Sequence, residues 1–417
     1  MARTILHIST RLILGGSQEN TVLSCEGQAE LGHEVHLAFG PIFGPEGSLL
    51  ERAESFRTGD GRSIGCHELP NLVREIHPVK DHFCFHRDLK RLIDEVRPDI
   101  VHTHSSKAGI LGRWAAWVAM KRLGKPIGVV HTIHGPPFMP VEGGVVSRTK
   151  TRVKNGVYTV AERFAAKRCH TIVSVADAMT DQFLARGIGK DEQYVTVRSG
   201  METERFLNAA PGEDRDSMRA ALGFGDEDFV IGTVARLAQH KGHDDILDGL
   251  EADLKNDPRL KLLWVGDGWW TDRLMERVRA MGLEKQVLHT GLVVQHRVGA
   301  MMRAMDLLVH PSYREGLPRT VPQALLCGVP VCASDTDGTP EVITDARVDA
   351  DGGTGCLFPV GDTGALGDAV RWMIEHGDER RASAERGRAR CAAWFATAAM
   401  VGALEGVYEE ALAKAGG

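Results

Sequence analysis

The chain has 417 residues, of which 43% are hydrophobic and 25% charged, and its formal net charge is −6. This composition argues against an intrinsically disordered chain, and the negative net charge gives no global attraction to nucleic acid or anionic lipid. A chain of this length exceeds what one hydrophobic core usually supports, so we expect two domains of roughly 200 residues. Any anion binding must be local, and no nucleic-acid partner is expected.

The N-terminal apolar run, at 3–8, leads directly into a Gly-rich loop and lacks the features of a signal peptide. The most apolar helical stretch, 108–120, is interrupted by Arg113 and is too short to span a bilayer. Eight cysteines are scattered without CxxC or zinc-finger spacing, which favours reduced and mostly buried thiols. These features predict a cytoplasmic protein.

Short β-rich runs alternate with helical patterns along the chain, and the pattern is interrupted at 194–200. The strand predictions are 5–9, 35–39, 99–104, 127–133, 229–234, 260–265, 287–289 and 306–310, and the helix predictions are 17–31, 107–123, 244–254 and 271–281. Such alternation predicts parallel strands joined by crossover helices, and therefore an α/β fold. Two Rossmann-like domains are the simplest account, with a ligand site outside the carboxyl ends of their strands, in the cleft between them.

The segment 310–341 is the most informative, because an acidic loop is followed there by the start of a helix. Proline has no N–H group, so Pro322 must lie in the first turn of this helix, which begins near Arg319. The unpaired amides of that turn and the charge of Arg319 favour a phosphate group, and Glu315 can accept hydrogen bonds from hydroxyls. An anionic, sugar-bearing ligand is therefore predicted. The residues expected around it are Glu315, Gly316, Leu317, Pro318, Arg319, Thr320 and Gln323.

This segment resembles the E-x7-E region of retaining GT-B glycosyltransferases of family 4, with Glu315 in the first acidic position and Gln323 in the second. The resemblance implies that Glu315 lies near the donor sugar, and that Gln323 can bind the ribose hydroxyls only as a neutral group. It also implies a nucleotide-sugar donor and no cofactor. A UDP-sugar is favoured, with a GDP-sugar as the alternative.

Arg236 ends a predicted strand, and Lys241 follows five residues later on the same loop. Two cations at this place suit a diphosphate, whose negative charge rises as the glycosidic bond breaks. The Arg-x4-Lys spacing also matches the diphosphate signature of the family. Gly291 and Leu292 resemble the family's turn that borders the nucleotide base. An Asp-x-Asp metal site at 335–337 is disfavoured. The resemblance implies a fold whose enzymes generally neutralise the diphosphate with cations and helix dipoles, and this chain has both, so no catalytic metal is predicted.

In the first half of the chain, Gly15 and Gly16 follow the first strand and open a helix, where they permit close approach of a ligand. The sequence around His134 resembles the family's HTxHG segment, which implies that His134 lines the wall opposite the donor and orients the sugar. His102 and His104 share a strand face, so a set of metal ligands completed by His131 or His134 is one interpretation. No carboxylate or cysteine completes that set, so zinc is disfavoured.

The stretch 99–113 resembles a subset of the family that builds bacterial surface polysaccharides. Ser105, Ser106 and Lys107 lie at a strand-to-helix junction, where they can hold an acceptor phosphate; ordinary helix capping by serine is the alternative.

A basic stretch follows, with only Glu162 opposing it, and is either a solvated helix face or a peripheral contact with anionic membrane near a lipid-linked acceptor. Its basic residues are Arg148, Lys150, Arg152, Lys154, Arg163, Lys167 and Arg168.

Residues 199–206 resemble the interdomain link of the family. We expect an N-terminal acceptor domain at 1–199 and a C-terminal nucleotide-sugar domain at 200–395, and the resemblance implies that the helix at 396–417 crosses back onto the first domain. The predicted function is a retaining glycosyltransferase that moves a hexose-type sugar to the hydroxyl of a sugar or lipid-linked sugar acceptor, in bacterial polysaccharide or glycolipid synthesis. The alternatives are a sugar-nucleotide epimerase of the same architecture and a non-catalytic nucleotide-sugar-binding protein.

Overall fold

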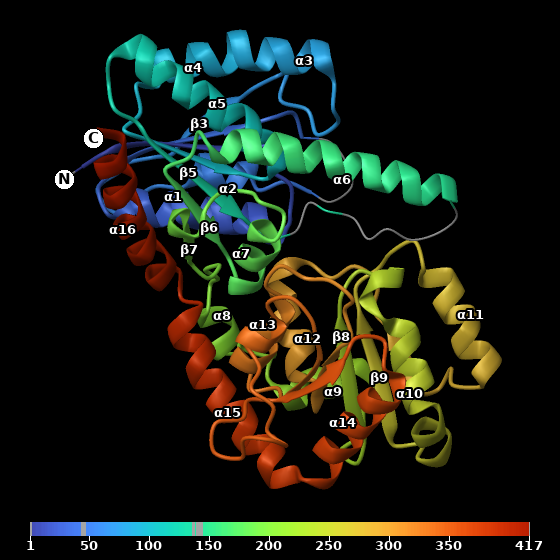
Figure 1. Ribbon diagram of the computed structural model, residues 1–417. Helices are drawn as coiled ribbons and strands as arrows, with labels where there is room; N and C mark the ends of the chain where they lie inside the picture. The colour runs from blue at the N-terminus through green and yellow to red at the C-terminus, as the bar shows by residue number, and fades with distance from the viewer. Residues whose placement is uncertain (1, 43–46, 136–137, 139–144, 417) are drawn as a thin grey trace. The chain divides into compact units, whose positions relative to one another are not determined.

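The computed structural model describes residues 2–42, 47–135, 138 and 145–416. The chain divides into two compact units, each with its own parallel β-sheet and surrounding helices (Figure 1). Unit 1 comprises Met1–Met201 and Thr397–Gly417, and unit 2 comprises Glu202–Ala396.

The sheet of unit 1 has the strand order β3-β2-β1-β4-β5-β6-β7. Its strands are β1 Thr4–Ser9, β2 Glu34–Phe39, β3 Gly65–Glu68, β4 Ile100–His104, β5 Gly128–Ile133, β6 Thr171–Ser174 and β7 Tyr194–Thr196. The chain builds outward from β1 to β3 and then returns to place β4 on the other side of β1. Ligands of such sheets bind at this reversal, outside the carboxyl ends of the two central strands.

The helices of unit 1 include one that comes from the far end of the chain. They are α1 Gly16–Glu30, α2 Leu50–Ser55, α3 Pro78–Phe83, α4 Lys90–Val96, α5 Ser106–Leu123, α6 Val145–Ala166, α7 Asp177–Leu184 and α16 Thr397–Gly416, with a π-helical turn η1 at Cys84–Leu89. Helix α16 packs on α1 and β5 and buries Leu404 and Tyr408 in one apolar cluster with Ile100 and Val130. The predicted return of the C-terminal helix to the first domain is confirmed.

The sheet of unit 2 has the strand order β10-β9-β8-β11-β12-β13, with its reversal between β8 and β11. Its strands are β8 Phe229–Val234, β9 Leu260–Val265, β10 Val287–His289, β11 Leu307–His310, β12 Val331–Asp335 and β13 Cys356–Pro359. Its α-helices are α8 Glu204–Leu207, α9 Arg215–Leu222, α10 His243–Asn256, α11 Thr271–Met281, α12 Val298–Arg303, α13 Thr320–Leu326, α14 Thr363–Glu375 and α15 Gly377–Trp394.

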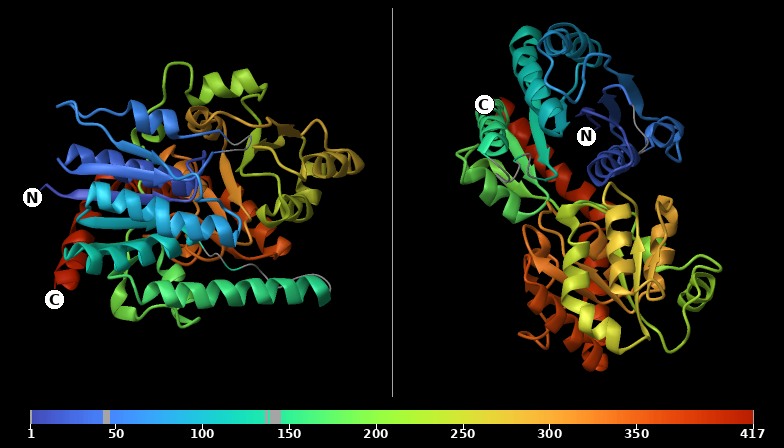
Figure 2. Two further views of the ribbon diagram at one scale, coloured as in Figure 1. Left: turned by 90° about the horizontal axis from the view of Figure 1, so that it is seen from above. Right: turned by 90° about the vertical axis from the view of Figure 1, so that its right-hand side faces the viewer.

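The predicted strands and helices all occur within a few residues of their expected bounds, and the α/β class is confirmed. The structure adds β3, β6, β12 and β13, which were not predicted, and it places the edge strand β7 where an interruption was expected. In Figure 2 the first half of α6 extends beyond the rest of unit 1. Within the described residues, no helix has the length and apolar character that crossing a membrane requires.

Candidate functional site

The central feature of unit 2 is a buried ion pair at the carboxyl ends of its two central strands. Lys241 ends a short 3-10 helix, Gln239–Lys241, that follows β8, and Glu315 lies in the loop after β11. The Glu315 carboxylate accepts hydrogen bonds from Lys241 Nζ and, at 3.0 Å, from His310 Nε2. The Glu315 backbone N–H donates to Asp337 Oδ2 at 2.7 Å, so this loop is anchored from both sides.

The surroundings of Glu315 decide its charge. Burial acts to raise the pKa of Glu315, but the hydrogen bond from His310 and the positive charge of Lys241 outweigh it and hold the pKa well below its ordinary value. Glu315 is therefore ionised at neutral pH, where it accepts hydrogen bonds and cannot donate a proton.

Helix α13 continues from this loop. Arg319 is its N-cap residue, and the Gln323 side chain is buried. Thr320 Oγ1 lies 3.2 Å from His310 Nδ1. Gly316 O accepts from Gly338 N at 3.1 Å, which ties the loop to the segment after β12. Leu317 and Pro318, in the same loop, are buried. Thr320 and His310 therefore connect the helix start to the Glu315 carboxylate.

Two further predicted residues lie on neighbouring loops of the same sheet edge. Arg236 follows β8, is exposed, and lies over the ring of Trp269 at 5.7 Å. Gly291 follows β10 with φ of +71°, and its carbonyl accepts from Gly266 N at 3.1 Å. Leu292 beside it is 79% exposed. A large apolar side chain so exposed at a ligand edge is suited to contact a flat ring.

Unit 1 carries a cavity of about 490 Å³ at the carboxyl edge of its own sheet. The residues around it that bear on ligand chemistry are Ser17, Arg74, Ser105, Ser106, His134 and Glu162. Ser17 lies in the first turn of α1, just after Gly15 and Gly16, and Ser106 begins α5. Two helix starts and an arginine therefore border one space, a composition that favours an anion.

Ser105 is held in a conformation that a non-glycine residue rarely adopts, with φ of +63°. Its side chain does not cap α5. Instead, Ser105 Oγ lies 2.7 Å from Thr10 Oγ1 and accepts from Thr10 N at 3.2 Å, which joins the ends of β1 and β4. Backbone strain of this kind is retained where surrounding contacts enforce it, often at functional sites.

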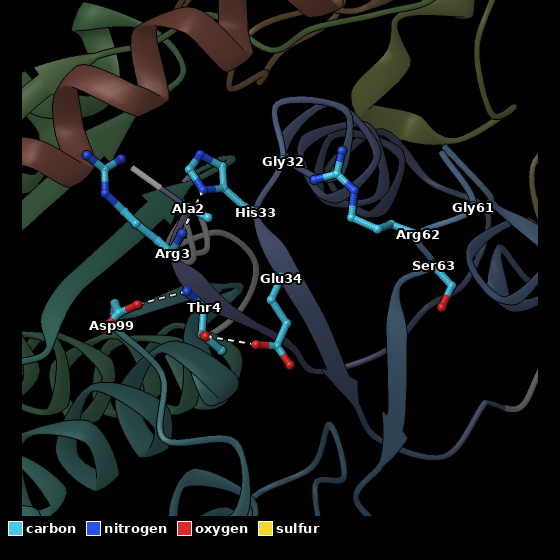
Figure 3. A pocket seen from close by; sticks show the side chains of 10 residues that line it. All are labelled: Ala2, Arg3, Thr4, Gly32, His33, Glu34, Gly61, Arg62, Ser63 and Asp99. Carbon is cyan, nitrogen blue, oxygen red and sulfur yellow. Dashed lines mark hydrogen bonds between the residues drawn. The ribbon is translucent and has the colours of Figure 1, made fainter. Parts of the chain in front are cut away.

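A second cavity of unit 1, of about 450 Å³, lies at the opposite edge of the sheet, near the amino ends of β1 and β2 (Figure 3). Its polar groups satisfy one another. Thr4 N donates to Asp99 at 2.8 Å, Thr4 Oγ1 donates to Glu34 at 3.0 Å, and Arg3 pairs with Glu405 at 2.9 Å. Since ligands of parallel sheets bind at the carboxyl ends of strands, this cavity is not the candidate site.

Comparisons with known proteins agree with this geometry. Residues 14–205 match the model of Glycosyltransferase Family 4, and residues 214–390 match that of Glycosyl transferases group 1. The chain is 31% identical over 281 residues to the UDP-Gal:alpha-D-GlcNAc-diphosphoundecaprenol alpha-1,3-galactosyltransferase of Escherichia coli, covering 66% of this chain and 67% of that protein. The chain belongs to glycosyltransferase family 4.

Two further comparisons cover more of this glycosyltransferase. It is 25% identical over 324 residues to the putative glycosyltransferase EpsD of Bacillus subtilis, covering 78% of this chain and 79% of EpsD. The crystal structure of Anabaena Alr3699/HepE in complex with UDP-glucose aligns with a TM-score of 0.76 at 19% identity, covering 98% of this chain and 99% of that one. The GT-B fold expected from the sequence is confirmed.

Some sequence interpretations of this glycosyltransferase need correction. Lys107 does not line the cavity of unit 1, because its ammonium group is paired with Asp81 at 2.5 Å. Helix capping by Ser105, the alternative interpretation, is also wrong. Glu162 does not oppose the basic surface of α6, because its side chain is buried and paired with Arg113 at 2.6 Å. Each error has the same origin: the sequence shows spacing but not the direction of a side chain.

The structure also adds polar residues that sequence reasoning missed. In the glycosyltransferase's second unit, His310 and Asp337 hold Glu315. In its first unit, Arg74 lines the cavity, and His7 lies beside His102 and His104, with one ligand-type nitrogen of each within 4.8 Å of the others. His7 was detectable in principle, because a histidine within an otherwise apolar strand is unusual.

Proposed function

We propose that this glycosyltransferase moves a sugar, with retention of anomeric configuration, from a nucleoside diphosphate sugar to a hydroxyl group of a lipid-diphosphate-linked sugar. The observation that carries the proposal is the ionised Glu315, held by Lys241 and His310 at the carboxyl ends of the central strands of unit 2. This carboxylate accepts hydrogen bonds from sugar hydroxyls. Lys241 and Arg236 bind the diphosphate, and the exposed Leu292 contacts the base.

A UDP-sugar is the favoured donor, with a GDP-sugar as the alternative. The E. coli relative is named for UDP-Gal, and the Anabaena structure is titled as a complex with UDP-glucose. Gln323 contacts the ribose as a neutral hydrogen-bonding group. Arg319 adds positive charge at the start of α13; because this helix has only seven residues, the cations rather than its dipole supply most of the attraction.

Unit 1 takes the acceptor. Its cavity of about 490 Å³ combines Arg74 with the hydroxyls of Ser17 and Ser106 at two helix starts, a set that suits a phosphate. The acceptor named for the E. coli relative carries its sugar on a diphosphate. His134, which lines the same cavity, orients the acceptor hydroxyl.

The reaction requires no covalent intermediate on the protein. The bond between the anomeric carbon and the leaving phosphate oxygen breaks while the acceptor oxygen bonds to the same face of that carbon. The acceptor proton passes to the leaving phosphate oxygen. Lys241 and Arg236 stabilise the charge that grows on the diphosphate, the term that usually dominates such catalysis. No step needs a metal ion or a cofactor.

Helix α6 provides a peripheral contact with anionic membrane, where a lipid-linked acceptor resides. Four cations along its first half, Arg148, Lys150, Arg152 and Lys154, are exposed. Apolar side chains are exposed between and after them, with Val153 at 62%, Val157 at 52%, Val160 at 67% and Phe164 at 36% exposed. A cationic helix with exposed apolar residues is typical of helices that lie in the membrane interface.

The two alternatives make different demands on Glu315. An epimerase needs a carboxyl group that exchanges protons near neutral pH, whereas the low pKa of Glu315 keeps it ionised. A binding protein would need no leaving-group cations, although it could use them for affinity.

The deciding experiment combines the purified protein with UDP- and GDP-sugars, chosen by thermal shift, and with a lipid-diphosphate N-acetylhexosamine. We expect release of the nucleotide only when acceptor is present, and an α-linked product by NMR. Conversion of the free nucleotide sugar without acceptor would identify an epimerase. Stabilisation by a donor without nucleotide release in any acceptor pool would identify a binding protein.

A further inference from the structure

The core of unit 1 contains a group of fully buried polar side chains that the proposed reaction does not use. His7 on β1, Gln28 on α1, His102 and His104 on β4, and Tyr408 on α16 are each at most 1% exposed. Burying polar groups is costly unless every one is hydrogen-bonded. Helices α1 and α16, from opposite ends of the sequence, pack together over this part of the sheet (Figure 1).

These side chains form one continuous hydrogen-bonded chain that ends at His134 in the acceptor cavity. His134 Nε2 lies 3.1 Å from His104 Nδ1, His104 Nε2 lies 2.9 Å from His7 Nδ1, and His7 Nε2 lies 2.7 Å from Gln28 Oε1. On the other side of the amide, Gln28 Nε2 donates to Tyr408 Oη at 2.7 Å. His102 continues from there, with Nδ1 at 2.7 Å from Tyr408 Oη and Nε2 at 2.7 Å from Thr132 Oγ1.

The orientation of the Gln28 amide determines the direction of every bond. A carbonyl oxygen can only accept, so His7 must carry its proton on Nε2 and accept through Nδ1. His104 then carries its proton on Nε2 and accepts through Nδ1. It follows that His134 donates through Nε2, which in the neutral ring leaves the lone pair on Nδ1. Inverting this one amide would reverse all of these bonds and move the His134 proton to Nδ1.

We propose that Gln28, His7 and His104 form a relay that positions His134, fixing both its ring orientation and its neutral Nε2–H tautomer. This inference rests on the proposed role of His134 in orienting the acceptor hydroxyl. With the lone pair on Nδ1, that nitrogen accepts a hydrogen bond from the acceptor hydroxyl when the acceptor binds. In the reaction the same proton passes to the leaving phosphate oxygen. The relay residues contact no substrate and are positioning residues.

The relay requires histidines that remain neutral, and their surroundings provide this. Burial lowers the pKa of His7 to about 4, against the hydrogen bond that His7 donates to Gln28, which raises it. Burial also lowers the pKa values of His102 and His104 well below the ordinary value. Burial also raises the pKa of Tyr408, which keeps its hydroxyl as a donor to His102.

A metal centre is the competing interpretation of the same histidines. Their nitrogens lie within 4.8 Å of one another. However, both ring nitrogens of His7, His102 and His104 have hydrogen-bond partners within 3.1 Å. A bound dication would have to break several of these bonds without a carboxylate among these groups to offset its charge. The relay is therefore favoured.

The test uses the full-length protein without ligand, labelled with ¹⁵N-histidine, and reads the His134 tautomer from its ring nitrogen shifts. His134→Asn identifies the signals. We expect the Nε2–H form in the wild type and its loss in Gln28→Met, which keeps the volume but removes both hydrogen-bonding groups. Tyr408→Phe frees the amide to invert and should give a mixture of tautomers. It replaces Gln28→Met if that variant does not fold.

The functional arm compares kcat and the acceptor KM. We expect Gln28→Met to lower kcat about 10-fold, the scale of one misdirected hydrogen bond, with little change in KM. The matched control is His67→Gln, which disrupts another histidine pair of unit 1, His36 Nδ1 to His67 Nε2 at 2.9 Å, and should leave both readouts unchanged.

Three results of the tautomer and kinetic measurements would overturn the relay: the Nδ1–H form in the wild type, a fall in kcat without a change of tautomer, or a change of tautomer with an unchanged kcat. One equivalent of zinc in the purified protein that disappears in His7→Gln would also overturn it and establish a metal centre. An inactive wild type would instead count against the proposed transferase, while the tautomer measurement, which needs no substrate, would still decide the relay.

Discussion

Lys241 and Glu315 pair in a largely buried place, with side chains 19% and 15% exposed. The ion pair with the carboxylate fixes the position of the lysine ammonium group. A diphosphate therefore binds to a cation that is already in place. Pre-organised charge of this kind needs little rearrangement as negative charge develops on the leaving group. The same pair keeps Glu315 from becoming a neutral acid.

Replacing Lys241 by alanine should lower kcat roughly 100-fold, the scale of losing one group that stabilises the leaving group. Acceptor-dependent nucleotide release measures the change. Lys255→Ala is the matched control, because Lys255 also pairs with a glutamate, Glu251 at 2.6 Å, but lies half-exposed on α10. Turnover of the Lys241 variant within about threefold of the wild type would contradict the proposed role.

The positions of single site residues were predicted best where a residue lies within a few positions of a predicted strand. Lys241 and Glu315 each lie in the segment that follows a predicted strand, so the sequence alone predicts them at the carboxyl edge. Their partners were not predictable in this way. Asp337 reaches Glu315 from the next strand's end, and His7 meets His104 across 97 positions of sequence, which only the register of the sheet determines.

Among the elements, α6 is unusual because its two halves differ in how they are covered. Its second half is fixed to unit 1, where Glu162 pairs with the buried Arg113 and Arg163 donates to Arg186 O at 2.8 Å. Its first half presents four cations and Val153 to solvent among its described side chains. The sole acidic residue of the helix faces inward, so the outer surface is more basic than its composition indicates.

The double variant Lys150→Gln with Lys154→Gln should weaken binding to anionic vesicles about 30-fold, since each cation near such a surface contributes about 1 kcal/mol. Sedimentation with phosphatidylglycerol vesicles at low and high salt measures this. Lys255→Gln with Lys285→Gln changes the charge equally on unit 2 and should leave binding unaffected. Equal losses in the two double variants would indicate a general charge effect and refute a specific role of α6.

Long periodic elements were predicted well and short ones unevenly. Of the strands with three or four residues, β10 and β11 were predicted, whereas β3, β6 and β13 were not. The edge strand β7 lies in the predicted interruption, and its three residues are only half-buried. Tertiary pairing, rather than local preference, makes these segments strands.

For the molecule as a whole, the buried histidines connect stability to pH. Burial lowers the pKa of His7 from 6.5 to about 4, and those of His102 and His104 move in the same direction. Between these two values the unfolded chain binds more protons than the folded one, so stability falls as pH drops through that window and is complete above it. Once the pH is below both pKa values, His7 alone lowers the free energy of unfolding by on the order of 3 kcal/mol.

Hydrogen exchange of the β1 and β4 peptides, corrected for intrinsic rates, should therefore show progressively weaker protection from pH 7 to pH 5. His7→Asn removes one titrating group and should reduce this pH dependence, even if the variant is less stable at pH 7. A pH dependence as steep in His7→Asn as in the wild type would show that His7 does not contribute to it.

The contribution of α16 to unit 1 has a consequence for how the protein is made. Tyr408 and Leu404 complete the apolar cluster around Ile100 and Val130, yet the ribosome synthesises them only after all of unit 2. At ordinary elongation speeds that interval lasts on the order of 10 to 40 s. During it, nascent unit 1 exposes an uncovered apolar face, and the segment that follows unit 2 acts as the closing step of its assembly. In the living cell, chaperones should therefore bind mainly to the part of the chain that is translated first.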